Sequence, residues 1–267
     1  MTFLIPQDQS LSETFLSDGH VVIPAEDADG LDRIRSCAAD LAATHLDVDT
    51  PKDPSAFLNG IHNVVSGENL NALRLAVFNG LNAEPWFQPT FFALARTAIE
   101  ALVGNELCIQ RRVNLSVQMP SDDSSLLPVH ADVWDGDSPF EIVLWVPLVD
   151  CANTKTMYLL APEKNREAQR TLAKFSNGSA EDIFLAIADD VEFIKVTYGE
   201  VMLFSQTLMH GNRVNVEPET RWSMNCRFKS IMSPYADKKL GEFFEPITLR
   251  AVTRMGMEYE LPEGFDD

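Results

Sequence analysis

Three residues in the sequence have the types and spacing of a metal site. His130 and Asp132 stand two positions apart in HADVWDGD, and His210 lies much later in LMHGNR. Alternate residues of an extended strand project from the same face, so His130 and Asp132 are predicted to point together. Two imidazoles and one carboxylate are the ligand set of oxygen-activating non-haem iron(II), whose open positions suit dioxygen and a 2-oxo acid. A surface strand with a histidine–carboxylate hydrogen bond is the alternative for the pair alone.

A second pair, Arg221 and Ser223, fits the far end of such an oxo acid. These two residues also alternate, so their side chains share one face of a predicted strand. The planar guanidinium of arginine matches a carboxylate through two hydrogen bonds, and a hydroxyl supplies a further donor. The pair therefore indicates a site for the distal carboxylate of a dicarboxylate. An ordinary strand arginine paired with a surface acid is the alternative.

Polar and apolar residues alternate along two segments, 112–118 and 221–227. The polar members are Arg112, Asn114, Ser116 and Gln118 in the first segment and Arg221, Ser223, Asn225 and Arg227 in the second. If Arg221 faces the interior of a barrel, the other polar members are expected to face it too, with their apolar partners packed outward against helices. Asn114 and Gln118 are then candidates for binding the co-substrate, at its oxo-acid end, or else the substrate, and Arg112, Asn225 and Arg227 are candidates for substrate binding. A solvent-facing edge strand is the alternative.

Trp134 and Asp135 follow the metal pair closely in the sequence. Both are candidates for the border of a substrate entrance, although simple packing would also account for Trp134. The remaining histidines lie outside these motifs and are expected to be structural: His20, His45 and His62.

The elements that must position these residues change character near residue 105. Before it, a short strand at 19–24 precedes helices expected at 30–45, 69–79 and 89–103. After it, short segments rich in branched and aromatic residues indicate antiparallel strands. The expected strands are 107–119, 129–133, 140–148, 156–160, 191–196, 201–204, 207–213 and 221–230. They predict a mainly β fold with helical additions, a double-stranded β-helix (a cupin-like jelly roll) packed against N-terminal helices.

The chain is expected to form a single domain, because 267 residues bury one substantial core without requiring a second. Within it, residues 1–105 are a mainly helical support, 106–230 the β-barrel core and 231–267 a C-terminal tail. Residues 162–190 carry helical spacing and are predicted to be a helical insertion between strands. This insertion and residues 233–245 are candidates for lids over the barrel mouth or for interfaces.

The composition excludes some partners and permits others. A formal net charge of −19 opposes binding to phosphate backbones and anionic lipids, so no nucleic-acid or membrane partner is expected. The apolar stretches are far shorter than the roughly 20 residues of a membrane span, and the N-terminus does not resemble a secretory signal. Apolar tail residues, Phe243 and Phe244, are expected to be exposed and would permit a homodimer. Four cysteines without a CxxC pair are interpreted as reduced thiols of a cytoplasmic protein: Cys37, Cys108, Cys151 and Cys226.

The order of these motifs resembles that of the iron(II)- and 2-oxoglutarate-dependent dioxygenases: an HxD pair, a long β segment, a distal histidine and then RxS. The segments FLSDGHVVIPA and HGNRVN are most similar to the phytanoyl-CoA hydroxylase-like branch. More narrowly, four further segments resemble oxygenases of carbohydrate and aminoglycoside biosynthesis clusters: NLSVQMP, HADVWDGDSPFEIVLWVPLVDC, RWSMNCRFKS and FFEPITLRAVT.

The resemblance implies that His130, Asp132 and His210 bind Fe(II), and that Arg221 and Ser223 bind 2-oxoglutarate, which reacts with O2 to release succinate and CO2. It further implies hydroxylation, oxidative cyclisation or desaturation of a small polar metabolite such as a sugar or sugar-derived compound. Halogenation is disfavoured, because related halogenases have a small residue in place of the carboxylate ligand. Two alternatives would release no succinate: a cupin-type metal-dependent sugar isomerase or epimerase, and a non-catalytic carbohydrate-binding barrel.

Overall fold

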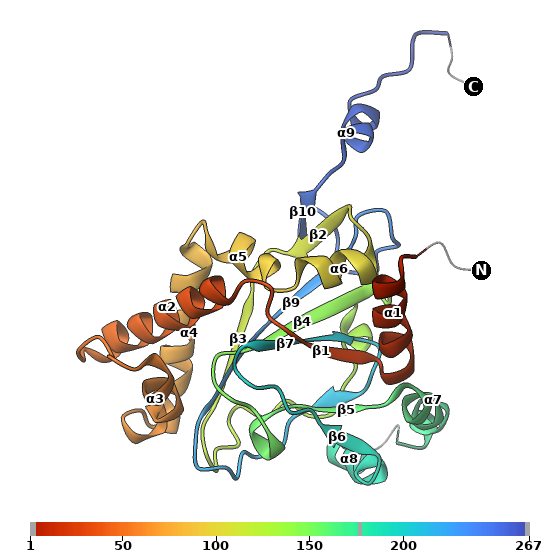
Figure 1. Ribbon diagram of the computed structural model, residues 1–267. Helices are drawn as coiled ribbons and strands as arrows, with labels where there is room; N and C mark the ends of the chain where they lie inside the picture. The colour runs from red at the N-terminus through yellow and green to blue at the C-terminus, as the bar shows by residue number, and fades with distance from the viewer. Residues whose placement is uncertain (1–3, 176–177, 265–267) are drawn as a thin grey trace.

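The computed structural model describes residues 4–175 and 178–264, and two antiparallel sheets form its centre. The larger sheet consists of β1 (His20–Pro24), β2 (Leu107–Gln110), β3 (Asn114–Gln118), β4 (Glu141–Pro147), β7 (Glu200–Ser205), β9 (Arg221–Ser230) and β10 (Phe244–Thr248). Its order is β1, β7, β4, β9, β2 and β10, while β3 pairs with the first half of β9. The smaller sheet has the order β6 (Val191–Phe193), β5 (Tyr158–Leu160) and β8 (His210–Gly211). Together the two sheets form the predicted jelly roll (Figure 1).

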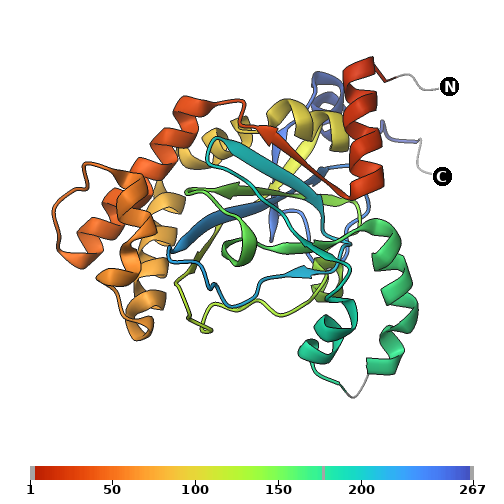
Figure 2. The ribbon, with the colours of Figure 1, turned by 60° about the horizontal axis from the view of Figure 1, so that its bottom comes forward.

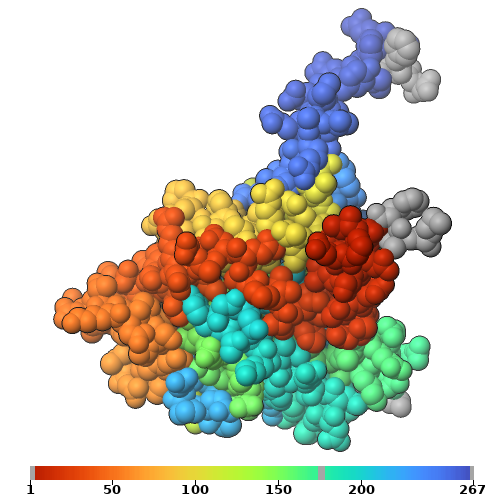
Figure 3. Space-filling model, viewed as in Figure 1, coloured from red at the N-terminus to blue at the C-terminus, as the bar shows by residue number. Residues whose placement is uncertain are grey.

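Helices surround this β core (Figures 1 and 2). The N-terminal ones are α1 (Pro6–Asp18), α2 (Ala28–Leu46), α3 (Pro54–Asn59), α4 (Gly67–Ala83), α5 (Phe87–Ala93) and α6 (Arg96–Val103). Two more, α7 (Pro162–Thr171) and α8 (Ala180–Ile187), lie on the side away from α2, α3 and α4. The last, α9 (Ala251–Met257), projects from the body of the protein (Figure 3). None of the helices in the described residues combines the length and apolar character needed to span a membrane.

The alternation along β9 explains how the sheet separates a polar face from an apolar one. Its apolar members are buried in the main core: Trp222, Met224, Cys226 and Phe228. The Trp222 indole donates to the carbonyl oxygen of Leu58 on α3 over 2.9 Å, and the Phe228 ring lies 5.7 Å from that of Phe92 on α5. The polar members line a cavity on the opposite face. The predicted outward packing of the apolar residues against N-terminal helices is therefore confirmed.

Several elements differ from the sequence prediction. Residues 107–119 form two strands, because the chain leaves the sheet at Arg111 and Arg112 and then pairs with a different half of β9. Residues 129–133 form no strand, since His130 makes only an isolated β-bridge and a short 3-10 turn, η2 (Asp132–Asp135), follows. The strand expected at 207–213 is reduced to β8.

The helical predictions were better for the long elements than for the short ones. Those at 30–45 and 69–79 are confirmed as α2 and α4, whereas 89–103 is divided into α5 and α6 at Ala95, which leaves the helical conformation (φ −148°, ψ 29°). Among the α-helices and strands of the described residues, α1, α3, α9 and β10 were not predicted. Neither α1 nor α9 has a fully buried residue, and α1 contacts the main core only through partly buried side chains, Leu11 and Phe15 among them.

The predicted insertion contains α7, a 3-10 turn η4 (Leu172–Phe175) and α8, while residues 176–177 lie outside the described residues. The buried Asn165 of α7 accepts a hydrogen bond from the backbone N–H of Met209 (2.8 Å) and donates to the carbonyl of Thr207 (3.1 Å). Side chains of α7 and α8 also pack against a small core that includes Tyr158 and Met209. The insertion thus supports the segment that leads into His210.

Part of the C-terminal tail belongs to the larger sheet. There β10 pairs with β2, and Phe244 is fully buried, with its ring 6.2 Å from that of Tyr235 and 5.0 Å from that of Phe243. The expected exposure of Phe244 is wrong, because strand pairing carries this residue into the core. Phe243 is partly buried, so the pair no longer supports a homodimer.

The break between β2 and β3 is held by one side chain of α4. Asn82 accepts a hydrogen bond from the backbone N–H of Val113 (2.9 Å) and donates to its carbonyl oxygen (3.0 Å). Val113 is buried, so Asn82→Ala would leave two main-chain groups without partners. We expect this change to lower the free energy of unfolding by about 1–3 kcal/mol, measured by urea denaturation. Asn79→Ala, at an exposed position of the same helix, is the control; equal effects of both changes would contradict the assignment.

Candidate active site

Two main-chain hydrogen bonds place the two predicted histidine ligands side by side. The N–H of His130 donates to the carbonyl of His210 over 3.0 Å, and the N–H of His210 donates to the carbonyl of His130 over 2.8 Å. This antiparallel bridge brings the imidazole rings to a centroid distance of 4.2 Å. His130 and His210 therefore meet although no extended strand contains His130.

The ring nitrogens of both histidines have a defined orientation. Nδ1 of His130 lies 2.8 Å from the carbonyl oxygen of Pro128, and Nδ1 of His210 lies 2.8 Å from that of Leu208. A carbonyl oxygen only accepts, so each Nδ1 must carry a proton, and each neutral ring then presents a lone pair on Nε2. Such a bond behind the ring is the usual way in which proteins orient a metal-binding histidine.

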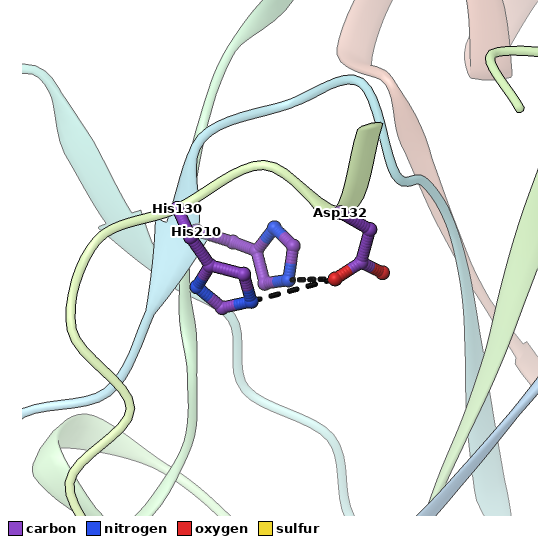
Figure 4. A group of neighbouring side chains, drawn as sticks. All are labelled: His130, Asp132 and His210. Carbon is purple, nitrogen blue, oxygen red and sulfur yellow. Dashed lines mark ion pairs between the residues drawn. The ribbon is translucent and has the colours of Figure 1, made fainter. Parts of the chain in front are cut away.

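Asp132 completes the group, as Figure 4 shows. Its Oδ1 lies 3.4 Å from Nε2 of His130 and 3.7 Å from Nε2 of His210. One donor atom from each of the three residues lies within 4.8 Å of the others, so a single ion fits among them. The chain turns at Asp132, where the 3-10 turn η2 begins. The side chains of His130 and Asp132 nevertheless point to a common centre.

The surroundings of His210 and Asp132 favour the protonation states that a metal ion requires, whereas those of His130 favour a proton as long as no metal is bound. Complete burial lowers the pKa of His210 to about 4, so its imidazole stays neutral at physiological pH. Burial alone would raise the pKa of Asp132, but the His130 hydrogen bond and the Arg227 charge outweigh burial and hold that pKa well below its usual range. Burial alone would lower the pKa of His130. The hydrogen bond to Asp132 and the bond to the Pro128 carbonyl outweigh burial, so the pKa of His130 lies above the usual value.

Close packing behind the histidine bridge depends on Gly211. A Cβ atom added at Gly211 would lie 2.6 Å from the Tyr158 hydroxyl and 2.7 Å from the carbonyl oxygen of Leu127, inside any normal contact distance. Phe204 packs edge-on against the ring of His210, with centroids 5.1 Å apart. The HG pair in the sequence therefore reflects a histidine held between tightly packed segments.

The three residues lie in the wall of a cavity of about 470 Å³, within the range of roughly 300–1,000 Å³ that is typical of small-molecule sites. Its polar lining includes the inward residues of β3 and β9, and its apolar lining includes Val143 and Trp145 of β4. A second hollow of about 530 Å³ shares Ser116 and Leu127 with it. This second hollow lies between α4 and β3 and is lined by neither histidine.

Arg221 lies at the buried side of this cavity and has no acidic partner among the described residues. Its Nη2 donates to the Ser116 hydroxyl over 2.9 Å, its Nη1 reaches the Thr156 carbonyl at 3.5 Å, and its buried Nε has no hydrogen-bond partner in the described structure. Burial lowers the pKa of Arg221 to about 10, which still leaves the guanidinium charged at neutral pH. A buried cation in this condition is costly unless an anion occupies the cavity.

Three other predicted residues also line the cavity: Ser223, Asn114 and Asn225. Strand register explains their placement, because Ser223 is opposite Ser116 and Asn225 is opposite Asn114 across β9 and β3. The Asn114 amide donates to Oδ1 of Asn225 over 3.0 Å. The two-residue period thus gave the inner face of β9 and of β3 as far as Ser116, whereas Gln118 does not line the cavity.

Arg227 also lines the cavity, but its contacts differ from the predicted role in substrate binding. Its Nη2 lies 2.8 Å from Oδ2 of Asp132, the carboxylate oxygen that does not face the histidines. A salt bridge to the candidate metal ligand is therefore its principal contact. The sequence signal was the alternation along β9, which gives the face of Arg227 but not its partner.

Three of the remaining candidates lie outside the cavity lining: Arg112, Gln118 and Trp134. Arg112 is exposed at the break between β2 and β3, where its guanidinium lies 5.4 Å from the centre of the Phe78 ring. Gln118 is fully buried, and its amide donates to the carbonyl oxygen of Arg213 over 2.6 Å, which supports the chain just after His210. Trp134 is 42% exposed beside the site, whereas its neighbour Asp135 lines the cavity.

Sequence reasoning missed several residues that support the site. The alternation gives Ser116 a place on the inner face but not its role as the hydrogen-bond partner of Arg221. Gln206 and Asp137 contact Arg227 and carried no motif that would have distinguished them. His62, which was expected to be structural, lies within hydrogen-bond distance of the Thr220 hydroxyl (2.9 Å). The four cysteines are free thiols, as expected.

The fold and the His-Asp-His group together define a double-stranded β-helix with a two-histidine, one-carboxylate candidate metal centre. Solved structures with a similar fold include EctD from S. alaskensis with 2-oxoglutarate and 5-hydroxyectoine (TM-score 0.54, 19% identity, covering 88% of this chain and 80% of that one). HygX from Streptomyces hygroscopicus with nickel and 2-oxoglutarate bound is also similar (TM-score 0.52, 15% identity, 89% and 90%). A third is a non-heme monooxygenase, the ThoJ–Ni complex (TM-score 0.53, 17% identity, 91% and 85%). These likenesses establish the fold. No protein-family model and no curated protein sequence matches the chain.

The lowered pKa of His210 predicts how the stability of the metal-free protein depends on pH. An unfolded histidine binds a proton near pH 6.5, whereas His210 in the folded chain resists protonation down to about pH 4. The unfolded state therefore binds more protons in this window, and the stability present above pH 6.5 is lost as the pH falls toward 4. We expect this residue to contribute a decrease of about 2–3 kcal/mol.

The measurement is urea denaturation of metal-free protein at several pH values, for the unaltered chain and for His210→Gln. In the variant, the free energy of unfolding should fall less steeply between pH 6.5 and 4. Subtracting its pH curve from that of the unaltered chain leaves the contribution of His210, because both proteins contain His130 and Asp132. His45→Gln, at an exposed position of α2, serves as the control and should leave the slope unchanged. Parallel curves for the unaltered chain and His210→Gln would refute the prediction.

Proposed function

We propose that this protein is an Fe(II)- and 2-oxoglutarate-dependent oxygenase, with His130, Asp132 and His210 as the metal ligands and Arg221 as the anchor of the co-substrate. The observation that carries the proposal is the buried guanidinium of Arg221, which has no anionic partner among the described residues and lies in the same cavity as the three ligands. A dicarboxylate supplies both an anion for Arg221 and a chelating end for the metal.

The chemistry of the donor set fits this metal. Two neutral imidazoles and one carboxylate leave part of the coordination sphere free, as non-haem iron(II) oxygenases require, and Nε2 of each histidine is available because Nδ1 is bonded to a carbonyl. When bound, iron and 2-oxoglutarate would supply the oxidising chemistry. Solved structures of the same fold, EctD and HygX, contain 2-oxoglutarate and lend support by analogy.

The chain's own residues would then bind, orient and shield the reactants. Arg221 and Ser223 would hold the distal carboxylate, with the Ser116 hydroxyl keeping the guanidinium in place. Apolar side chains of Val143 and Trp145 would restrict water around the site. No side chain needs to act as a nucleophile, so the protein's contribution is geometry and electrostatics.

We further propose that the primary substrate is a small polar metabolite, such as a sugar or sugar-derived compound, that is hydroxylated, cyclised or desaturated. Asn114, Asn225 and Asp135 offer hydrogen-bonding groups in the cavity, as a hydroxyl-rich ligand requires. The adjoining hollow offers additional space beside Ser116. We expect the protein to act in the cytoplasm, where its free thiols stay reduced.

The cofactor assignment is tested by anaerobic titration of the metal-free protein with Fe(II) and 2-oxoglutarate, monitored by the visible charge-transfer band of the chelate. We expect a band in the unaltered protein and none in His210→Ala. Arg221→Met should need at least about 30-fold more 2-oxoglutarate, because loss of one member of a buried charge pair costs about 2 kcal/mol or more. Arg112→Met removes an exposed arginine outside the cavity and should behave like the unaltered protein.

Absence of the band in the unaltered protein, despite bound iron, would contradict the proposal. The same preparation then distinguishes the alternatives through succinate. A cupin-type isomerase or epimerase and a carbohydrate-binding barrel would consume no 2-oxoglutarate in air, whereas the proposed oxygenase releases succinate and should do so faster when the correct sugar is added.

A further inference from the structure

We propose that Arg227 is a positioning residue for the metal centre, and that a segment of the C-terminal tail holds Arg227 in place from behind. The inference rests on the proposed function, because it assigns His130, Asp132 and His210 as metal ligands. It adds a reason why Asp132 would bind the metal through one oxygen only. It also gives residues 234–238, which lie far from the ligands in sequence, a part in the site.

The two oxygens of Asp132 have different partners. Oδ1 faces Nε2 of both histidines, while Oδ2 lies 2.8 Å from Nη2 of Arg227. A carboxylate can bind a metal ion through one oxygen or through both. With Oδ2 held by the guanidinium, only Oδ1 is available to a metal ion. The position that a second oxygen would occupy stays free for an incoming ligand.

Arg227 is itself fixed by neighbours on several strands. Its Nε donates to the Gln206 side chain over 3.2 Å and lies 3.4 Å from Oδ1 of Asp137, and its Nη1 donates to the Gln110 side chain over 3.1 Å. Each of its three nitrogens therefore has a protein partner. Such a guanidinium is better suited to orienting Asp132 than to binding substrate, which corrects the role expected from the sequence.

The chain of charges continues into the tail. Lys238 forms an ion pair with Oδ2 of the buried Asp137, so negative and positive groups alternate from Asp132 through Arg227 and Asp137 to Lys238. Buried charges are tolerated when each is paired with one of opposite sign. Loss of one member would remove one of the charges that holds its neighbour, so the geometry of Asp132 depends on the series.

Backbone contacts fix the tail segment against the loop that follows Asp132. The Ser138 hydroxyl donates to the carbonyl of Pro234 over 2.7 Å, and the N–H of Asp237 donates to the carbonyl of Gly136 over 3.2 Å. Gly136 has a positive φ of 86°, and a Cβ atom there would lie 2.9 Å from the Asp237 carboxylate. The loop and residues 234–238 are therefore built to lie against each other.

The test measures Co(II) binding to metal-free protein without 2-oxoglutarate, using the visible ligand-field spectrum of the bound ion. Arg227→Met should weaken Co(II) binding about 10- to 100-fold, the usual effect of removing a residue that orients a metal ligand. At saturation its spectrum should also differ, because Asp132 is free to bind through both oxygens. Arg227→Lys, which keeps the charge but not the planar fork, should recover part of the affinity.

Lys238→Met should weaken Co(II) binding in the same direction but less, by at least about threefold. Lys239→Met is the matched control, because the ammonium of this adjacent lysine donates to the carbonyl of Ala236 and, in the described part of the chain, has no ion pair with Asp137; this change should leave Co(II) binding unaltered. Urea denaturation and circular dichroism of each metal-free variant show whether it folds, and Asp137→Asn offers a second way to break the series if Arg227→Met does not fold.

The outcomes separate this inference from the proposed function. If the unaltered protein binds no Co(II) at the site, both fail. If the unaltered protein binds Co(II) and folded Arg227→Met has the same affinity and the same spectrum, the positioning role of Arg227 is refuted while the metal centre stands. Equal effects of Lys238→Met and Lys239→Met would refute the role of the tail alone.

Discussion

Charge buried inside the β core is the constraint on which this structure depends. Arg221, Asp132 and Arg227 all lie on the inner side of the sheet, where each unpaired charge would cost several kcal/mol. The protein meets this constraint with two strands, β3 and β9, that are polar inside and apolar outside, and the helices α2 to α6 cover the apolar face. The helical layer is thus a requirement of the site. Without it, the outward residues of β9 would be exposed to water.

The sequence predicted those parts of the site that depend on local periodicity. Alternation along β9 gave the inward face of Arg221, Ser223, Asn225 and Arg227, and the HxD spacing gave a common direction for His130 and Asp132. It could not give partners, because these come from remote segments. Arg112 and Arg227 occupy equivalent places in the two alternating patterns, yet one is exposed and the other forms a salt bridge. The two arginines differ because Arg112 lies at the break between β2 and β3, whereas Arg227 lies within β9.

The same distinction applies to the fold. Long helices with one buried stripe were predicted well, since 3.6-residue periodicity records the burial of that stripe. Elements stabilised by distant contacts were not: β10 exists because it pairs with β2, and the bridge at His130 exists because it pairs with His210. Neither segment can be located from its own residues alone, because its backbone pairing depends on a partner far away in the sequence. A predicted strand at 129–133 nevertheless gave the right ligand geometry, because one extended residue, Ala131, separates the two side chains.

The pairing of early strands with late ones has a consequence for the order in which the chain acquires its structure. β1 is hydrogen-bonded to β7, β2 to β9 and β10, and the histidine ligands stand on segments that meet only when the jelly roll closes. A fold with so many contacts between remote segments is expected to form slowly. A growing polypeptide at the ribosome would therefore not yet bring His210 to the other two members of the candidate metal site. Metal capture would come last, and by mass action the bound ion would then stabilise the closed barrel.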